Sequence, residues 1–168
     1  QLFSTAADLL KGNFPDAPSC LVLDIRLPGL SGLDFQNQLA QANIHIPVII
    51  MTGHGDIPMT VRAMKAGAVD FLTKPFRDQD ILDAVTRAIE RDRKRRDSEN
   101  ALSDLRARFA ALTPREQEIM KLVTTGLMNK QVAAEISLSE ITVKIHRGHA
   151  MKKMSARSLA DLVRVAEL

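Results

Sequence analysis

Residues 19–25 are Ser-Cys-Leu-Val-Leu-Asp-Ile, a short apolar run with an aspartate, Asp24, next to its end. A second run, Ile-Pro-Val-Ile-Ile-Met, occupies residues 46–51. Both runs are too short for a helix and rich in β-branched residues, which favours strands buried on both faces. A third strand is expected at residues 68–73. We therefore predict a core built on three buried strands.

Helical patterns fill the gaps between these strands. Apolar residues recur at helical spacing in residues 32–42 and again in residues 59–66, where Gly67 ends the pattern. Strands that alternate with helices indicate right-handed βαβ units and a parallel sheet. The first part of the chain is therefore predicted to be an α/β domain.

A long helix is expected from Asp78 onward, since no glycine or proline interrupts the chain until Pro114. Its last part repeats apolar residues at spacings of three, four and three, as in a short coiled-coil seam. Two interpretations remain open: a connector whose stripe docks on a neighbouring domain, or a dimer seam. The stripe consists of Leu102, Leu105, Phe109 and Leu112.

A second domain is expected to begin at Thr113-Pro114-Arg115-Glu116. Threonine at the N-cap, proline at the first helical position and glutamate at the third are typical of a helix start. Gly126 suits the end of that helix. Further helices are expected after Asn129, after Ser139 and around residues 159–165, so this domain is predicted to be all-α.

Composition excludes several classes of protein. The 168 residues are 45% hydrophobic and 26% charged, which is typical of a packed globular chain and not of a disordered one. No apolar run approaches the ~20 residues of a membrane span, so neither a membrane partner nor export is expected. We therefore expect a cytoplasmic location. One cysteine, Cys20, excludes an internal disulfide framework. The sequence also contains no phosphate-binding glycine loop and no serine-hydrolase elbow.

Charge changes sign along the chain. Residues 1–86 carry six Lys or Arg against nine Asp or Glu, whereas residues 87–112 carry eight against five and residues 113–168 carry nine against six. An acidic first part followed by a basic second part suggests two domains with different partners, the basic one being a candidate for a polyanion. A structural metal is not expected, because His146 and His149 lack acidic or thiol companions at ligand spacing.

Three polar residues stand at the ends of the predicted strands: Asp24, Thr52 and Lys74. The carboxyl ends of parallel strands share one edge, where ligands bind. There Asp24 could act as a nucleophile toward phosphorus, with Lys74 and Thr52 binding the transferred oxygens. The alternative is that these strand ends are polar only for solubility.

The same segments carry a family resemblance. Residues 23–32, 51–56 and 71–76 resemble the receiver domain of bacterial two-component response regulators, and residues 113–168 resemble the LuxR-type helix-turn-helix. Together they point to the FixJ/NarL class, and residues 51–66 and 126–131 are most similar to regulators of aromatic-hydrocarbon breakdown such as the styrene-responsive one. The resemblance implies a receiver at 1–86, with an incomplete flavodoxin-like doubly wound parallel sheet. A linker helix at 87–112 and a four-helix DNA-binding domain at 113–168 would follow.

The resemblance also implies roles in the receiver. Asp24 would accept phosphate from a sensor histidine kinase, and Lys74 would pair with that phosphate. Thr52 and Phe71 would form the switch, and the Lys74-Pro75 bond would be cis. His54 could tune loss of the phosphate, whereas Cys20 and His45 are interpreted as packing or surface groups.

One departure concerns the start of the chain. Residues 1–4, Gln-Leu-Phe-Ser, resemble the end of the family's second strand, so the first strand, the first helix and an acidic pair would be missing. We expect Mg²⁺, the cofactor of receiver phosphorylation, to be held poorly by Asp24 and the backbone carbonyl of Arg26. On this interpretation the 168 residues are a fragment of a longer chain.

In the DNA-binding half, the resemblance places the helix after Ser139 in the major groove. Gly148 departs from the pattern, because some relatives carry there a side chain that reaches a base. The implied contacts are Lys144 and Ile145 to bases, Thr142, His146 and Arg147 near the backbone or groove edge, and Lys130 to phosphate.

The function expected is that of a phosphorylation-dependent transcriptional regulator and not of an enzyme. Its partners would be a sensor histidine kinase, promoter DNA, RNA polymerase and, when active, a second copy of the chain. One alternative is a constitutive DNA-binding module with a non-functional receiver. Another is a phosphatase-like hydrolase that uses Asp24 and Lys74, although it would need a second carboxylate and has no use for a DNA-binding half.

Overall fold

The computed structural model describes residues 1–12, 14–27, 30–53 and 57–167. The chain divides into two compact units, Gln1–Asp97 and Ser98–Leu168, which are considered separately. No helix among the described residues combines the length and apolar character that crossing a membrane requires.

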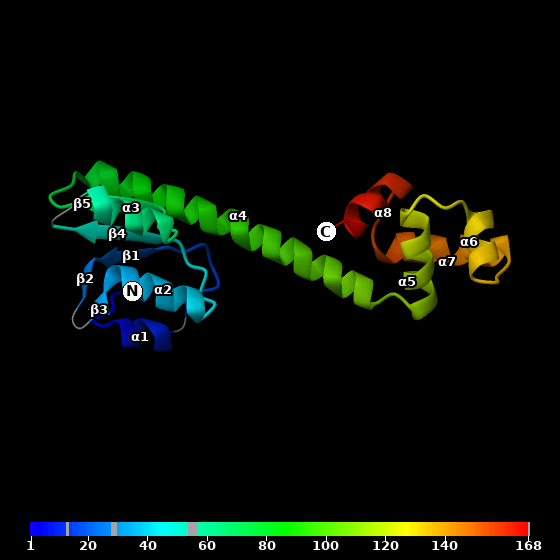
Figure 1. Cartoon of the computed structure of the whole chain (residues 1–168), viewed down its shortest axis with the longest axis horizontal. Coiled ribbons are helices and arrows are strands. Elements are labelled where there is room, and N and C mark those ends of the chain that lie inside the picture. Colours follow the sequence, from blue (N-terminus) through cyan, green and yellow to red (C-terminus); the bar gives the residue numbers. More distant parts are fainter. Residues whose placement is uncertain (13, 28–29, 54–56, 168) are drawn as a thin grey trace. The chain divides into compact units, whose positions relative to one another are not determined.

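The first unit is built on a three-stranded parallel sheet in the order β1-β4-β5, which confirms the three predicted strands (Figure 1). Strand β4 is central: its Met51 pairs with Asp24 of β1, and its Thr52 with Thr73 of β5. The elements of this unit are α1 (Ala6–Lys11), β1 (Leu21–Asp24), β2 (Arg26–Leu27), β3 (Leu30–Ser31), α2 (Gly32–Gln41), β4 (Val48–Thr52), α3 (Ile57–Lys65), β5 (Asp70–Thr73) and the first part of α4 (Asp78–Ala110).

Both faces of the sheet are covered, as continuous apolar strands require. On one face Ile50 belongs to a buried cluster with Phe35 of α2 and Ala63 of α3. On the other face Ile49 packs with Ala84 and Ala88 of α4. Because alternate residues of β4 enter opposite cores, the strand fixes the positions of helices on both sides of the sheet.

Two local features differ from the sequence prediction. Residues 1–5 form no strand, in contrast to the predicted strand end. The turn after β1 contains a two-residue antiparallel ladder, β2-β3, that no periodicity could indicate. It brings Gly32 so close to β1 that a Cβ would lie 3.0 Å from the carbonyl oxygen of Asp24, which explains the glycine.

Helix α4 is the predicted long helix, and Asp92 connects it to the loop before β1. The Asp92 side chain is only 1% exposed. One of its oxygens accepts the backbone N–H of Ser19 at 3.0 Å, and both oxygens pair with the guanidinium groups of Arg95 and Arg96. Burial opposes the charge, but these hydrogen bonds and ion pairs hold the pKa of Asp92 below its ordinary value.

The second unit is all-α, as predicted, with α5 (Pro114–Thr124), α6 (Asn129–Glu135), α7 (Glu140–Lys153) and α8 (Leu159–Ala166). The capping box at Thr113 and Glu116 is formed, and Gly126 has a φ of +94° just after α5. Ile119, Val132, Val143 and Leu162 come from all four helices and meet in one buried cluster.

The apolar stripe at the end of α4 meets this same cluster. Leu112 is 4% exposed within it, and Leu105 packs against it. These leucines are therefore engaged by their own chain, which favours the docked connector over the dimer seam as the interpretation of the stripe.

Candidate functional site

The carboxyl edge of the sheet brings Asp24 and Lys74 together. Asp24 ends β1 and Lys74 follows β5, and their Oδ2 and Nζ atoms are 2.6 Å apart. The second carboxylate oxygen of Asp24 accepts the backbone N–H of Arg26 at 3.0 Å. Two donors thus orient the carboxylate, although its side chain remains 38% exposed and open to a reactant in solution.

The same contacts keep the carboxylate ionised. The hydrogen bond from Lys74 outweighs partial burial, and with the help of the Arg26 N–H it lowers the pKa of Asp24 below its ordinary value. An ionised oxygen is what nucleophilic attack on phosphorus requires. The Lys74-Pro75 peptide is cis, as expected, and the Lys74 N–H donates to the carbonyl of Thr52 at 2.7 Å.

Thr52 and Phe71 lie on the two strands beside this pair. Thr52 ends β4 and is only 1% exposed. Phe71 is half-buried on β5, where it is paired with Ile50 and packs against the core that includes Ala63. The hydroxyl and the ring thus occupy neighbouring strands next to Asp24 and Lys74. His54, expected to tune loss of the phosphate, lies outside the described residues.

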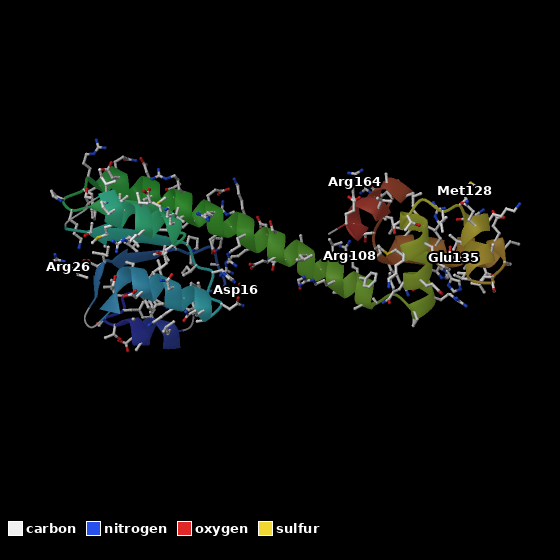
Figure 2. All side chains as sticks on the ribbon, in the orientation of Figure 1. Asp16, Arg26, Arg108, Met128, Glu135 and Arg164 are labelled. Atoms are coloured by element: carbon white, nitrogen blue, oxygen red, sulfur yellow. The ribbon has the colours of Figure 1, made fainter. Side chains whose placement is uncertain are left out.

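A Mg²⁺ ion fits the described residues only incompletely. Both carboxylate oxygens of Asp24 already accept hydrogen bonds, from Lys74 and Arg26. The side chain of Arg26 is exposed and projects outward from the first unit in Figure 2. Within the described part of the chain, the only group of three acidic, histidine or cysteine ligands lies elsewhere, in the second unit. Mg²⁺ prefers an octahedral oxygen shell, which Asp24 and the carbonyl of Arg26 alone would fill only in part.

In the second unit, α7 begins at Ser139, whose hydroxyl accepts the backbone N–H of Thr142 at 3.1 Å. Lys144 and Ile145 are exposed on this helix, and Lys130 is exposed on α6. Val143 is fully buried, so the opposite side of α7 is fixed in the core. The predicted base-contacting pair is therefore free to meet another molecule.

The remaining predicted contacts are partly engaged within the chain. Arg147 donates to the side chain of Asn129 at 2.9 Å, which ties α7 to the start of α6. The hydroxyls of Ser139 and Thr142 are 2.7 Å apart. The Nδ1 atom of His146 is buried and has no hydrogen-bond partner among the described residues.

Sequence reasoning missed Ile141, which is 73% exposed one turn before Ile145. An isoleucine so exposed at the start of a basic helix is a candidate for apolar contact with a thymine methyl group. Its spacing of three from Lys144 and four from Ile145 places all three residues on one face of the helix, and that spacing was the available signal.

The fold defines a class: an α/β receiver domain followed by a helix-turn-helix domain. Residues 1–86 match the response regulator receiver domain family, and residues 110–166 match the bacterial regulatory proteins of the luxR family. The chain belongs to the response regulators that combine these two domains. Such proteins regulate transcription in a phosphorylation-dependent way, and their receivers generally use Mg²⁺.

Individual relatives share nearly the whole chain. It is 68% identical over 165 residues to nodulation protein W of Bradyrhizobium diazoefficiens, covering 98% of this chain and 73% of the relative. It is 47% identical to the response regulator TmoT of Ectopseudomonas mendocina, covering 98% and 75%. The solved structure of the response regulator StyR matches with a TM-score of 0.87 and 47% identity, covering 98% of this chain and 83% of that one.

Proposed function

We propose that Asp24 is the phosphoryl acceptor of this regulator, with the phosphohistidine of a sensor kinase as donor. A carboxylate oxygen of Asp24 attacks phosphorus and forms an O–P bond while the P–N bond of the donor breaks. The bonding electrons return to the imidazole nitrogen of the kinase, which takes up a proton. The observation that supports this role is the Asp24–Lys74 pair, in which an ammonium stands 2.6 Å from the attacking group.

After transfer, Lys74 exchanges its carboxylate partner for the more highly charged phosphoryl group. In our proposal the hydroxyl of Thr52 turns toward the phosphoryl oxygens and Phe71 moves into the space vacated, which changes the surface around β5. The changed surface promotes pairing with a second copy of the chain, so that two exposed α7 helices bind promoter DNA together and recruit RNA polymerase. These events take place in the cytoplasm. We assign the receiver to residues 1–86, the linker to 87–112 and the DNA-binding domain to 113–168.

The acceptor assignment is tested by intact mass. Incubation of the full chain with acetyl phosphate and Mg²⁺ should add one phosphoryl group, and Asp24→Asn should abolish the gain. Asp34→Asn, at the exposed start of α2, is the matched control and should be phosphorylated like the wild type. An equal gain in Asp24→Asn would show that another residue is the acceptor.

In the proposed DNA-binding assignment, Lys144 and Ile145 contact bases. Near the backbone or groove edge lie Thr142, His146 and Arg147, and Lys130 contacts phosphate. Lys144→Ala should weaken binding to a promoter fragment, selected by the protein from a random pool, by about 1 to 3 kcal/mol. Lys121→Ala, an exposed lysine on α5, should leave it unchanged. Competition with random DNA distinguishes the roles: an equal loss on both DNAs would make Lys144 a phosphate contact.

A second candidate function is a constitutive DNA-binding module that needs no phosphate. It is favoured by one observation: both carboxylate oxygens of Asp24 already accept hydrogen bonds, from Lys74 and from the backbone N–H of Arg26. Under this alternative, acetyl phosphate would change neither the mass of the protein nor its affinity for the selected DNA.

A further inference from the structure

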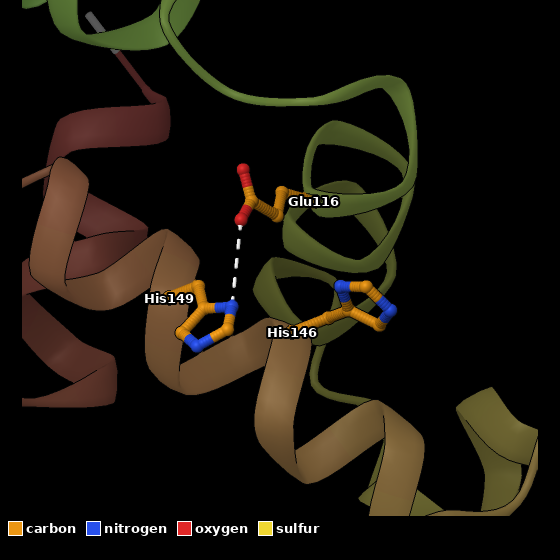
Figure 3. A group of neighbouring side chains, drawn as sticks. All are labelled: Glu116, His146 and His149. Carbon is orange, nitrogen blue, oxygen red and sulfur yellow. Dashed lines mark ion pairs between the residues drawn. The ribbon is translucent and has the colours of Figure 1, made fainter.

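Glu116, His146 and His149 form a cluster in the second unit, and of these three residues only His146 has a part in the proposed DNA contacts. Glu116 comes from the first turn of α5, and the two histidines lie three residues apart on α7. One ligand atom from each of the three side chains lies within 4.8 Å of the other two. Figure 3 shows the carboxylate of α5 facing the imidazole ring of His149, with His146 one turn earlier on the same helix.

The ligand atoms of this cluster that make no hydrogen bond point to a cation. Glu116 Oε2 is occupied by Lys153 at 2.6 Å and by the N–H of Thr113 at 2.8 Å. Its other oxygen, Oε1, faces His149 Nδ1 at 3.7 Å, too far for a hydrogen bond. His146 Nδ1 is buried without a partner among the described residues, and such an orphaned atom is uncommon in folded proteins.

We propose that Glu116, His146 and His149 form a binding site for a divalent transition-metal ion of the zinc type. Two imidazoles and one carboxylate are an established ligand set for Zn²⁺, with water in the fourth position. Ligand atoms of a tetrahedral zinc site are about 3.3 Å apart, so the cluster must contract by one or two ångströms. His149 can supply that movement because its side chain is 60% exposed, whereas the carboxylate is 4% exposed and held in place.

The charge of the site suits an ion that is bound reversibly. Lys153 already neutralises the Glu116 carboxylate. Since imidazole ligands carry no negative charge, the site has no net negative charge to balance a bound dication. Binding would nevertheless tie α7, the helix proposed to enter the DNA groove, to α5. The DNA-binding unit would thereby be stiffened by an ion that has no part in phosphorylation.

Titration of the full chain with ZnCl₂ in excess Mg²⁺ tests this site, because Mg²⁺ occupies oxygen-only sites and leaves imidazole sites free. One Zn²⁺ should bind per chain. His149→Gln and, separately, His146→Gln should each weaken binding about tenfold or more, and titration with Co²⁺ should give visible absorption bands that both variants lose. His149 is exposed, so its replacement should not impair folding.

Two controls locate the ion. His45→Gln removes an exposed histidine of the first unit that bonds only to Asn43 among the contacts described, and zinc binding should be unchanged. Asp24→Asn should abolish phosphorylation and leave zinc binding intact, which separates this proposal from the phosphoryl-acceptor role. Absence of zinc binding in the wild type, or equal binding in His149→Gln and His146→Gln, would overturn the proposal.

Discussion

Lys74 has two effects on a single carboxylate. Its hydrogen bond lowers the pKa of Asp24, and its charge lies 2.6 Å from the carboxylate that we propose as phosphoryl acceptor. We expect Lys74→Gln to raise the pKa of Asp24 toward its ordinary value, detectable by carbon NMR titration of the carboxyl group. The same variant should be phosphorylated by acetyl phosphate about tenfold more slowly or worse, since one charge-assisted contact worth about 1.5 to 3 kcal/mol is lost.

The matched control for that experiment is Lys65→Gln, which removes an exposed lysine at the end of α3. It should leave both the pKa of Asp24 and the rate of phosphorylation unchanged. If Lys74→Gln accepted phosphate at the wild-type rate, the proposed contact between Lys74 and the phosphoryl group would be wrong.

Glu116 predicts how the stability of the second unit depends on pH. The hydrogen bond from Lys153, followed by that from the Thr113 N–H, lowers the pKa of Glu116 from 4.5 to about 2. A depressed pKa stabilises the fold above the unfolded value, and this contribution is lost as pH falls through the folded value. Unfolding by urea, followed by circular dichroism, should therefore require less denaturant as pH decreases from about 5 to about 2.

Glu116→Gln should remove most of this pH dependence and lower the free energy of unfolding by about 1 to 3 kcal/mol at neutral pH. Glu118→Gln is the control, because Glu118 lies on the same helix but is 47% exposed and pairs only weakly with Arg115. A Glu116→Gln protein whose stability fell with pH as steeply as the wild type would show that other groups govern acid unfolding.

At the scale of elements, α4 is held to the loop before β1 by Asp92. Asp92→Ala removes the acceptor of the Ser19 N–H and leaves Arg95 and Arg96 without their shared partner. We expect a loss of about 2 to 3 kcal/mol and faster amide hydrogen exchange in residues 19–23. Glu90→Ala, which breaks an exposed ion pair with Arg93 on the same helix, should cost less than about 1 kcal/mol. Equal exchange in the two variants would contradict the role of Asp92.

The elements themselves could be predicted because their signals are local. Short apolar runs indicated β1, β4 and β5, and Thr113 with Glu116 indicated the start of α5, all within a few residues of the observed bounds. The alignment of Asp24 with Lys74 followed from the rule for parallel strands. By contrast, the contacts of Asp92 join residues 73 apart, and no spacing in the sequence indicates them.

The cluster around Glu116 is a second case of a long-range contact that sequence spacing does not indicate. Sequence spacing gave His146 and His149 no acidic companion, yet the packing of α5 against α7 supplies one from 30 residues away. The short β2-β3 ladder likewise could not be predicted from the sequence, because two-residue strands have no periodicity. Long-range pairing of polar side chains is therefore the part of the site that requires the structure.

For the whole molecule, the two units have separate chemistries: the carboxylate that we propose as phosphoryl acceptor lies in residues 1–97, and a basic helix lies in residues 98–168. The claim that makes them one regulator is that phosphate on Asp24 changes the affinity for DNA. A difference in affinity of about tenfold corresponds to about 1.4 kcal/mol of coupling, which is within the usual range for allosteric proteins.

The most direct test is the affinity of the full chain for the selected promoter DNA, measured with and without acetyl phosphate in Mg²⁺ at fixed salt. The wild type should bind about tenfold more tightly once phosphorylated, whereas Asp24→Asn should bind with the same affinity in both conditions. A phosphorylated wild-type protein that binds this DNA no differently from the unphosphorylated one would contradict phosphorylation control and leave the constitutive module as the function.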